Sequence, residues 1–407
     1  MKKHICIVPW TQLEIGPLGH VRPCCEYFEV FSDSADQKIK VDNSKILTIW
    51  NSDHMVNLRK EFLNDQKPKN CKNCWQIEDS EGISRRLNEN SEWANHFYKI
   101  NDTNLTFGPS LVDIKFGNIC NLKCRICNSI NSHSWAEEEV KIFGKTVSGT
   151  KSNFIIPEER TWQELEALLP TLEKILLSGG EPLLLKHHWK FLEKCIDKNH
   201  SHHLDLRYIT NGTISLTSYQ IDIWKKFRKI ELFISIDDIE DRFEYQRYPA
   251  KWFEVLENFQ KFRSIDFIDL VICNSISIFN VFYLPEFFDW INSINFDPKK
   301  IYLNYVRKPS HFDIGNFSSI QKNIVSEKLK IYQKYDLQPV INYMNVPIDY
   351  EINSSNKFLG TSHANISKLR EDIIKRSDSI RSENFKKIFP ELEKILKNTD
   401  TDSKIKT

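Results

Sequence analysis

Three cysteines occur within eight residues and could together hold an inorganic cluster. They are Cys120, Cys124 and Cys127, spaced C-x-x-x-C-x-x-C, and they follow directly on the strand-like run 111–116. A disulfide would use only two of these thiols, and a tetrahedral zinc ion would need a fourth ligand from elsewhere. A cubane iron–sulfur cluster held by three thiolates leaves one iron open, in contrast to the usual ligation by four cysteines. The spacing therefore favours a cluster with one open coordination site.

A second group of cysteines lies near the N-terminus. Cys71 and Cys74 form a C-x-x-C pair, and Cys24 ends a G-x-x-x-x-C spacing. Together with Cys6 they could make a four-thiolate site, in which Cys25 is an alternative to Cys24. Both zinc and a [4Fe–4S] cluster suit four thiolates, and the spacing alone slightly favours zinc because structural zinc sites are common.

The composition excludes several classes of partner. The 407 residues include 56 basic and 55 acidic side chains. This balance gives no electrostatic footprint for nucleic acid or an anionic membrane. No stretch approaches twenty apolar residues, and the start of the chain does not resemble a signal peptide. Clustered thiols without an export signal are typical of metal ligands in a reducing compartment, so we expect a cytoplasmic protein.

Strand-like and helical patterns alternate from residue 111 to 306, which is typical of β–α units around a parallel sheet. The predicted strands are 111–116, 174–177, 204–209, 230–236, 269–278 and 301–306. The predicted helices are 132–143, 185–198, 218–227, 251–262, 284–294 and 320–335. Six such steps fall short of the eight that close a full barrel. We therefore expect an α/β protein with a partial (β/α)6 parallel barrel.

Three regions follow from this pattern. Residues 1–110 are predicted to be a small cysteine-rich domain held together by a bound metal or cluster. Residues 111–306 are the predicted barrel, interrupted by an insertion at 144–170. Residues 307–407 are predicted to be a helical C-terminal region.

Glycine and polar residues follow several predicted strands, at the ends that build the site in parallel α/β proteins. These residues, beyond the cysteine triad, are Ser178, Gly179, Gly180, Glu181, Pro182, Thr210, Asn211, Ser235, Asp237, Asn274 and Ser275. Each of them alone is a common turn or capping residue. Because the carboxyl ends of parallel strands meet at one edge, the whole set predicts a ligand-binding site there.

The triad and the Gly-Gly-Glu-Pro sequence at 179–182 resemble the motifs of the radical S-adenosylmethionine (SAM) enzymes. In that family a [4Fe–4S] cluster on three cysteines chelates SAM through its open iron. Reductive cleavage of SAM then gives a 5′-deoxyadenosyl radical, which abstracts hydrogen from a substrate. The resemblance covers about residues 111–306 and implies that Cys120, Cys124 and Cys127 hold this cluster.

The same resemblance implies a set of SAM contacts. Arg247, in the stretch 244–248, corresponds to an arginine that meets the SAM carboxylate, for which a planar guanidinium is suited. Ile126 stands where an aromatic residue is usual, and its main chain can still meet adenine. The implied cofactor-binding residues are Ile126, Gly179, Gly180, Glu181, Pro182, Thr210, Asn211, Ser235, Asp237, Arg247 and Asn274.

The N-terminal cysteines are similar to the auxiliary-cluster region of the SPASM and twitch subfamilies, although that region usually follows the barrel. This likeness favours a second [4Fe–4S] cluster over zinc on Cys6, Cys24, Cys71 and Cys74. It implies an oxidoreductase or maturase that modifies a peptide or protein side chain and receives electrons from a flavodoxin- or ferredoxin-type donor. Two alternatives stay open: the same chemistry on a sugar or nucleotide-linked metabolite, and a non-catalytic zinc-binding scaffold.

Overall fold

The computed structural model describes residues 2–33, 36–42, 44–147, 158–332, 334–346 and 363–398. The predicted insertion at 144–170 therefore lies partly outside the described residues, and its second half contains helix α7 (Glu158–Leu168). Within the described residues, no helix is both long and apolar enough to cross a membrane.

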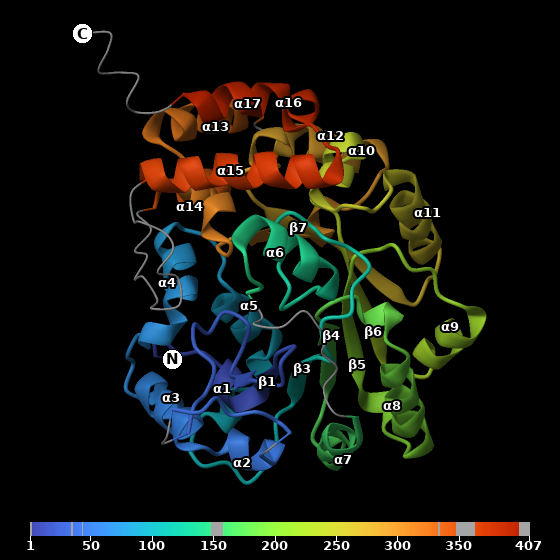
Figure 1. Cartoon of the computed structure of the whole chain (residues 1–407). Helices are drawn as coiled ribbons and strands as arrows, with labels where there is room; N and C mark the ends of the chain where they lie inside the picture. The colour runs from blue at the N-terminus through green and yellow to red at the C-terminus, as the bar shows by residue number, and fades with distance from the viewer. Residues whose placement is uncertain are drawn as a thin grey trace.

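One mostly parallel sheet organises the protein (Figure 1). Its order is β2-β1-β3-β4-β5-β6-β7-β8, and only the β1–β2 pair is antiparallel. The strands are β1 (Gln12–Ile15), β2 (Val21–Arg22), β3 (Leu111–Lys115), β4 (Lys174–Ser178), β5 (Asp205–Thr210), β6 (Lys229–Ser235), β7 (Ile268–Ile276) and β8 (Ile301–Tyr305). All six predicted strands are confirmed as β3 to β8, which form the expected parallel array.

Helices follow the strands in the predicted alternation. The helices of the core are α6 (Ala136–Phe143), α8 (Lys186–Asp197), α9 (Ser218–Trp224), α10 (Glu240–Gln246), α11 (Trp252–Arg263) and α12 (Leu284–Ser293). The C-terminal helices are α13 (Ser319–Ile331), α14 (Gln338–Asn345), α15 (His363–Arg381), α16 (Phe385–Ile388) and α17 (Pro390–Lys397). The helical C-terminal region is thus confirmed, whereas α10 was not predicted.

The first 110 residues share the sheet of the core. Their helices are α1 (Val8–Thr11), α2 (Ile46–Trp50), α3 (Asp53–Leu63), α4 (Lys72–Asp79) and α5 (Arg85–Glu92). Their strand β1 pairs in parallel with β3, and Trp10, Trp50 and Phe62 belong to one apolar core with the residues of the barrel strands. Cohesion of this region therefore does not depend on a metal alone, in contrast to the sequence-based expectation. The boundary after residue 110 stays a prediction.

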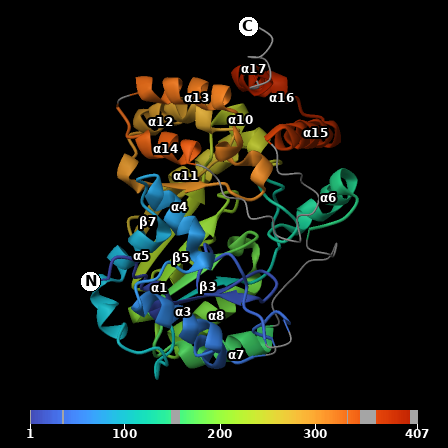
Figure 2. The same cartoon turned by 90° about the vertical axis from the view of Figure 1, so that its left-hand side faces the viewer.

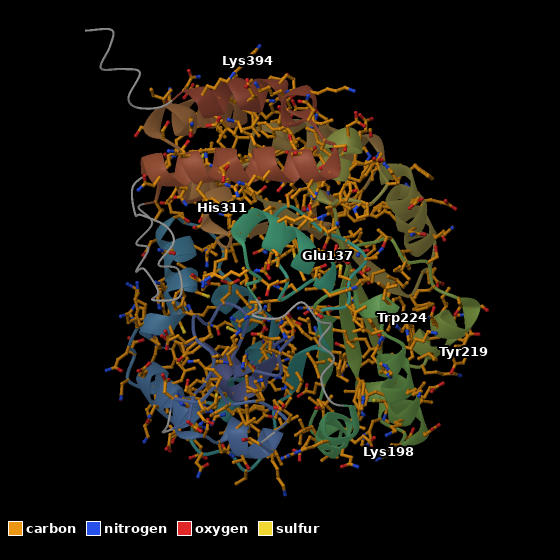
Figure 3. The ribbon with its side chains drawn as sticks, viewed as in Figure 1. Glu137, Lys198, Tyr219, Trp224, His311 and Lys394 are labelled. Carbon is orange, nitrogen blue, oxygen red and sulfur yellow. The ribbon has the colours of Figure 1, made fainter. Side chains whose placement is uncertain are left out.

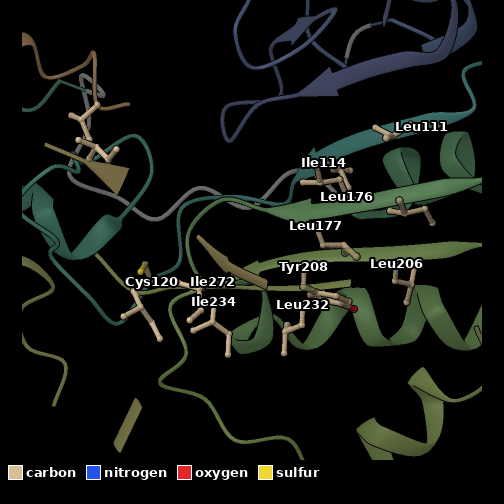
Figure 4. Close-up of a cluster of buried hydrophobic side chains, with 14 of the residues drawn as sticks. Leu111, Ile114, Cys120, Leu176, Leu177, Leu206, Tyr208, Leu232, Ile234 and Ile272 are labelled. Carbon is tan, nitrogen blue, oxygen red and sulfur yellow. The ribbon is translucent and has the colours of Figure 1, made fainter. Parts of the chain in front are cut away.

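One face of the sheet is apolar. Register places Ile114, Leu177, Tyr208, Leu232 and Leu270 in a single row across five strands, and Figure 4 shows several of these side chains together. Helices α8 and α9 cover this face, where Trp189 and Trp224 contact the Tyr208 ring. Each large apolar side chain that is fully buried there contributes about 1.5–3 kcal/mol.

The opposite face of the sheet carries charge. Glu14, Asp113, Arg207 and Glu231 share one row on this face, and α5 packs against it through Glu92. Glu231 accepts from Arg207 Nε at 2.8 Å and from Lys174 Nζ at 2.9 Å. Buried charges are tolerated here because each has a partner of opposite sign.

The C-terminal helices pack beyond the carboxyl ends of the strands. Helix α15 contacts α6, as both views show (Figures 1 and 2), and it also contacts the turn at 310–312. Arg370 of α15 donates to the carbonyl of His311 at 2.8 Å, and Figure 3 places His311 next to this helix. The C-terminal region is therefore anchored to the core at the edge where the site was predicted.

The charged network gives a stability prediction. Glu231→Gln lowers the free energy of unfolding at pH 7 by about 1–3 kcal/mol, since Lys174 and Arg207 lose a buried partner and keep only Glu92. These cations hold the pKa of Glu231 below its usual range, although burial itself raises it. The contribution is therefore complete above the unfolded pKa of about 4.3 and decreases as the pH falls below it.

Urea titrations at pH 7 and pH 4 measure this difference. The control is Glu257→Gln on α11, where Glu257 and its partner Lys261 are mostly exposed and little change is expected. Equal losses in the two variants at pH 7 would contradict the prediction.

Candidate functional site

The triad lies in the loop that follows β3, and side chains from the segment after it hold this loop in place. Ser134 Oγ donates to the carbonyl of Cys120 at 2.7 Å, and Trp135 Nε1 donates to that of Cys124 at 2.9 Å. The amide of Cys127 donates to the carbonyl of Cys124 at 2.9 Å, which closes a turn. The fold therefore gathers all three thiols in one compact loop.

Burial decides the protonation of these thiols. It raises the pKa of Cys120 to about 12 and also raises those of Cys124 and Cys127, and the three thiols repel one another as thiolates. Free thiols in this loop are consequently protonated at neutral pH. A bound cation would be needed to hold them as thiolates, which is the form that ligates metals.

Two glycines bring the end of β4 against the triad loop. Gly179 and Gly180 have φ angles of +80° and +57°. A Cβ on Gly180 would lie 2.2 Å from the carbonyl oxygen of Ile119, and one on Gly179 would lie 2.5 Å from Lys115 Cβ. The amide of Glu181 donates to that same Ile119 carbonyl at 2.8 Å. Only glycine permits this approach, so the motif packs directly on the loop that carries the cysteines.

The Glu181 carboxylate joins the ends of β4 and β5. It is fully buried and accepts from Thr210 Oγ1 at 2.8 Å, from the amide of Asn211 at 2.7 Å and from that of Leu183 at 3.1 Å. Burial raises its pKa to about 7. Asn211 Nδ2 in turn lies 3.9 Å from Cys120 Sγ. These contacts place Glu181, Thr210 and Asn211 beside the first cysteine of the triad.

Arg247 and Asp237 form a buried ion pair beside the second cysteine. Arg247 Nε and Nη2 both lie 2.8 Å from Asp237 Oδ2, and Arg247 Nη1 lies 4.0 Å from Cys124 Sγ. The other Asp237 oxygen accepts from the amide of Ser275 at 2.8 Å. The guanidinium is thus fixed in orientation next to the triad.

The remaining predicted residues lie at the same edge. Asn274 donates to the carbonyl of Asp237 at 2.8 Å, so its amide holds the end of β6. Ser235 is buried at the end of β6 and pairs in register with Cys273. Ile126 packs against the core from within the triad, and Pro182 begins a short 3-10 turn. The structure therefore brings every predicted cofactor-binding residue to the carboxyl edge.

The N-terminal cysteines surround a separate pocket. Its lining includes Cys6, Cys24, Cys71 and Cys74 together with Arg85 and Arg86. Burial raises the pKa of Cys24 to about 12 and that of Cys74 to about 11. Within the described ranges, no three His, Cys, Asp or Glu side chains lie close enough together to hold a single metal ion.

Cys24 and Cys25 differ in their surroundings. Cys24 lines the pocket, whereas Cys25 is not among its lining residues and accepts from Arg85 Nη1 at 2.7 Å. Four thiols around one pocket, with two guanidinium groups beside them, suit an anionic cluster ligated by four cysteines. The geometry favours Cys24 over Cys25 as the fourth ligand.

Two residues beside the cysteine sites, Arg85 and Arg125, were not identified from the sequence. Arg85 lies between the N-terminal pocket and Cys25, and Arg125 lies inside the triad with its side chain directed to α15. Arg125 could be singled out only by its place within the cysteine spacing. Its carboxylate partners, Asp378 and Glu383, lie more than 250 positions away in the chain.

Models of two known protein families match the two regions of the chain that contain the cysteine groups. Residues 114–290 match the model of the radical SAM superfamily, and residues 6–75 match the SPASM model, described as an iron–sulfur cluster-binding domain. A search of curated proteins gives no match.

Among solved structures, the chain is similar to anSMEcpe with bound AdoMet, at 18% identity and a TM-score of 0.36, covering 48% of this chain and 51% of that one. It is also similar to Streptococcus suis SuiB bound to S-adenosylmethionine, at 12% identity and a TM-score of 0.37, covering 62% and 51%. The chain thus spans about half the length of these structures.

The two matching models imply the cofactors. A radical SAM domain implies a [4Fe–4S] cluster with SAM, and a SPASM domain indicates an additional iron–sulfur cluster. The SPASM match comes first in the chain, as the cysteine spacing predicted. Residues 114–290 are therefore similar to the radical SAM superfamily, and residues 6–75, which precede them, are similar to the iron–sulfur cluster-binding SPASM domain.

Proposed function

We propose that this protein is an oxidoreductase that cleaves SAM reductively at a [4Fe–4S] cluster held by Cys120, Cys124 and Cys127, and that it oxidises a peptide or protein side chain. The observation that carries the proposal is the convergence of the triad, the 179–182 motif and the Asp237–Arg247 pair at one edge of the sheet. When bound, the cluster and SAM would supply an electron and a carbon-centred radical that takes hydrogen from the substrate.

The chain's own residues bind and orient the cofactor in this proposal. The three thiolates ligate the cluster, and the main chain at Gly179 and Gly180 lies close to the loop because neither has a side chain. Asp237 holds the Arg247 guanidinium, whose Nη1 faces the triad and suits the carboxylate of SAM. The rest of the surface around the proposed cofactor site is formed by Ile126, Thr210, Asn211, Ser235 and Asn274. Burial of this edge excludes water from the reacting groups.

The charged face of the sheet supports a polar substrate. Lys115 Nζ lies 2.5 Å from Glu14 and 3.3 Å from Asp113, directly before the triad loop. Arg22 pairs with Glu14 on the same face. Positively and negatively charged side chains next to the site could bind the amide groups and charged side chains of a peptide.

We further propose that Cys6, Cys24, Cys71 and Cys74 hold the auxiliary [4Fe–4S] cluster. The substrate radical left by hydrogen abstraction would pass one electron to this cluster and release one proton, so that the substrate would lose two electrons overall. Arg85 and Arg86 border the pocket and would stabilise added negative charge. A flavodoxin- or ferredoxin-type protein would supply the electron that starts each cycle.

The first test is SAM cleavage. Anaerobically reconstituted protein with dithionite is expected to release 5′-deoxyadenosine, measured by chromatography. Cys124→Ala should lower this rate at least about 100-fold, since the cluster loses a ligand. Cys195→Ala, which changes a buried cysteine of α8, serves as the control and should retain the rate. A colourless, iron-free protein, or unchanged cleavage in Cys124→Ala, would rule out the proposed function.

The second test is iron content. Cys71→Ala and Cys24→Ala should each lose about four iron ions per chain, because a four-cysteine cluster is lost. Cys25→Ala should keep them, since Cys25 lies off the pocket lining. Iron and zinc are measured by plasma mass spectrometry on the same samples. Loss of one zinc ion in place of iron would show that the N-terminal site is a zinc site.

The third test concerns the substrate. Candidate peptides, such as those encoded beside the gene, should increase 5′-deoxyadenosine release and lose hydrogen, seen as a decrease in peptide mass. Sugars and nucleotide-linked metabolites form the comparison set in the same assay. Stimulation by a metabolite and by none of the peptides would assign the protein to small-molecule chemistry.

A further inference from the structure

Arg125 ties the triad loop to the C-terminal region. It stands between Cys124 and Ile126, and only 3% of its surface is exposed. One of its terminal nitrogens donates to Asp378 Oδ1 at 2.7 Å and to Glu383 Oε2 at 2.5 Å. Both carboxylates come from α15 and the turn that follows it. The side chain of a residue within the cysteine motif thus forms ion pairs with a segment near the C-terminus.

Tyr245 completes the surroundings of Arg125. The guanidinium carbon lies 3.7 Å from the centre of the Tyr245 ring, which is within the range of a cation–π contact. The Tyr245 hydroxyl donates to Asp378 Oδ1 at 2.8 Å. The second oxygen of Asp378 accepts from the amide of Phe385 at 2.7 Å. Arg125 is therefore held from the ring face and from both carboxylates at once.

A reciprocal contact runs from α15 back to the loop. Arg381 donates to Glu138 Oε1 at 2.7 Å and to the carbonyl of Lys123 at 2.7 Å. Its guanidinium carbon lies 4.9 Å from the ring centres of both Trp135 and Tyr248. Because Trp135 also donates to the carbonyl of Cys124, this arginine packs against groups that hold the loop itself.

The segment 245–248 links these contacts to the SAM site. The amide of Arg125 donates to the carbonyl of Gln246, and the amide of Lys123 to that of Tyr248, each at 2.7 Å. Between these two carbonyls, Arg247 turns its side chain to Asp237 and to Cys124. A displacement of Tyr245 or Tyr248 would therefore move both Arg247 and the triad loop.

We infer that Arg125, Tyr245, Asp378, Arg381 and Glu383 form a C-terminal clamp that positions the triad cluster and Arg247 for SAM binding. The inference rests on the proposed function, because it needs a cluster on the triad. Ion pairs buried this deeply add little net stability compared with apolar packing, so their placement on this loop indicates a positioning role. The clamp residues act through the loop and touch no reacting atom.

The double variant Asp378→Asn/Glu383→Gln tests the clamp in the full-length, reconstituted protein. It removes both charges and keeps the shapes of the side chains. The auxiliary cluster is bound by N-terminal residues, and so it reports whether the fold persists. We expect that cluster to stay, while the change that SAM causes in the electron paramagnetic resonance spectrum of the reduced triad cluster is lost. The dissociation constant of SAM should rise at least tenfold.

Two further variants keep the test decisive. Glu371→Gln removes an exposed ion pair of the same helix, formed with Lys375, and should leave the spectrum and SAM binding unchanged. Arg125→Lys keeps the charge but loses the planar fork, and it should show a smaller rise in the dissociation constant. If the double variant loses both clusters and unfolds, the result for Arg125→Lys decides the question.

Unchanged SAM binding and an unchanged spectrum in the double variant, or in Arg125→Lys where the double variant unfolds, would overturn the clamp. Failure of the proposed function is distinguishable, because it appears in the wild-type protein as the absence of a triad cluster and would overturn both proposals. If only the clamp proposal is wrong, the wild type has a triad cluster, and SAM binding and the spectrum are the same in the wild type and the variants.

Discussion

The structure depends on one close contact between two main-chain segments. The chain at Gly180 approaches the carbonyl of Ile119 so closely that no Cβ fits between them. This contact presses the end of β4 onto the loop that carries the cysteines, and the Glu181 carboxylate extends it to β5. Strand pairing alone would leave that loop free to take many conformations. The contact explains why adjacent glycines and a buried acid occur together at this edge.

The core could be predicted because its patterns are local. Strands β3 to β8 and most of the helices between them appear as apolar runs with regular spacing. The strand ends gave all the residues proposed to bind the cofactor except Ile126 and Arg247, which only the family resemblance identified. Strand β1 was not predicted because it has only four residues, Gln12–Ile15, too few for their alternation of polar and apolar side chains to be distinctive. Helix α10 has seven residues, of which only Phe243, Tyr245 and Gln246 are buried, too few for a clear helical period.

The contacts of Arg125 and Arg85 could not be predicted, for a different reason. The residues next to each arginine in the sequence do not indicate its role. That role depends on the groups that the fold brings into contact with its side chain. For Arg125 these are carboxylates more than 250 positions away, and for Arg85 they include Cys25. Long-range ion pairs leave no periodic trace in a single sequence. The residues that bind a ligand can thus be found by motif, whereas the residues that hold them in place require the fold.

The pairing of β1 with β3 has a consequence for the order of the domains. An auxiliary site that shares a hydrogen-bonded sheet with the core is joined to it through continuous main-chain bonds. The distance between the two cysteine sites is then set by the geometry of the paired strands and does not depend on a flexible linker. A domain tethered in this way can come before or after the core in the chain, provided that its strand meets the same sheet edge. In the proposed reaction, the rate of electron transfer between the sites falls steeply with distance, and it would be unaffected by such a change in the order of the domains.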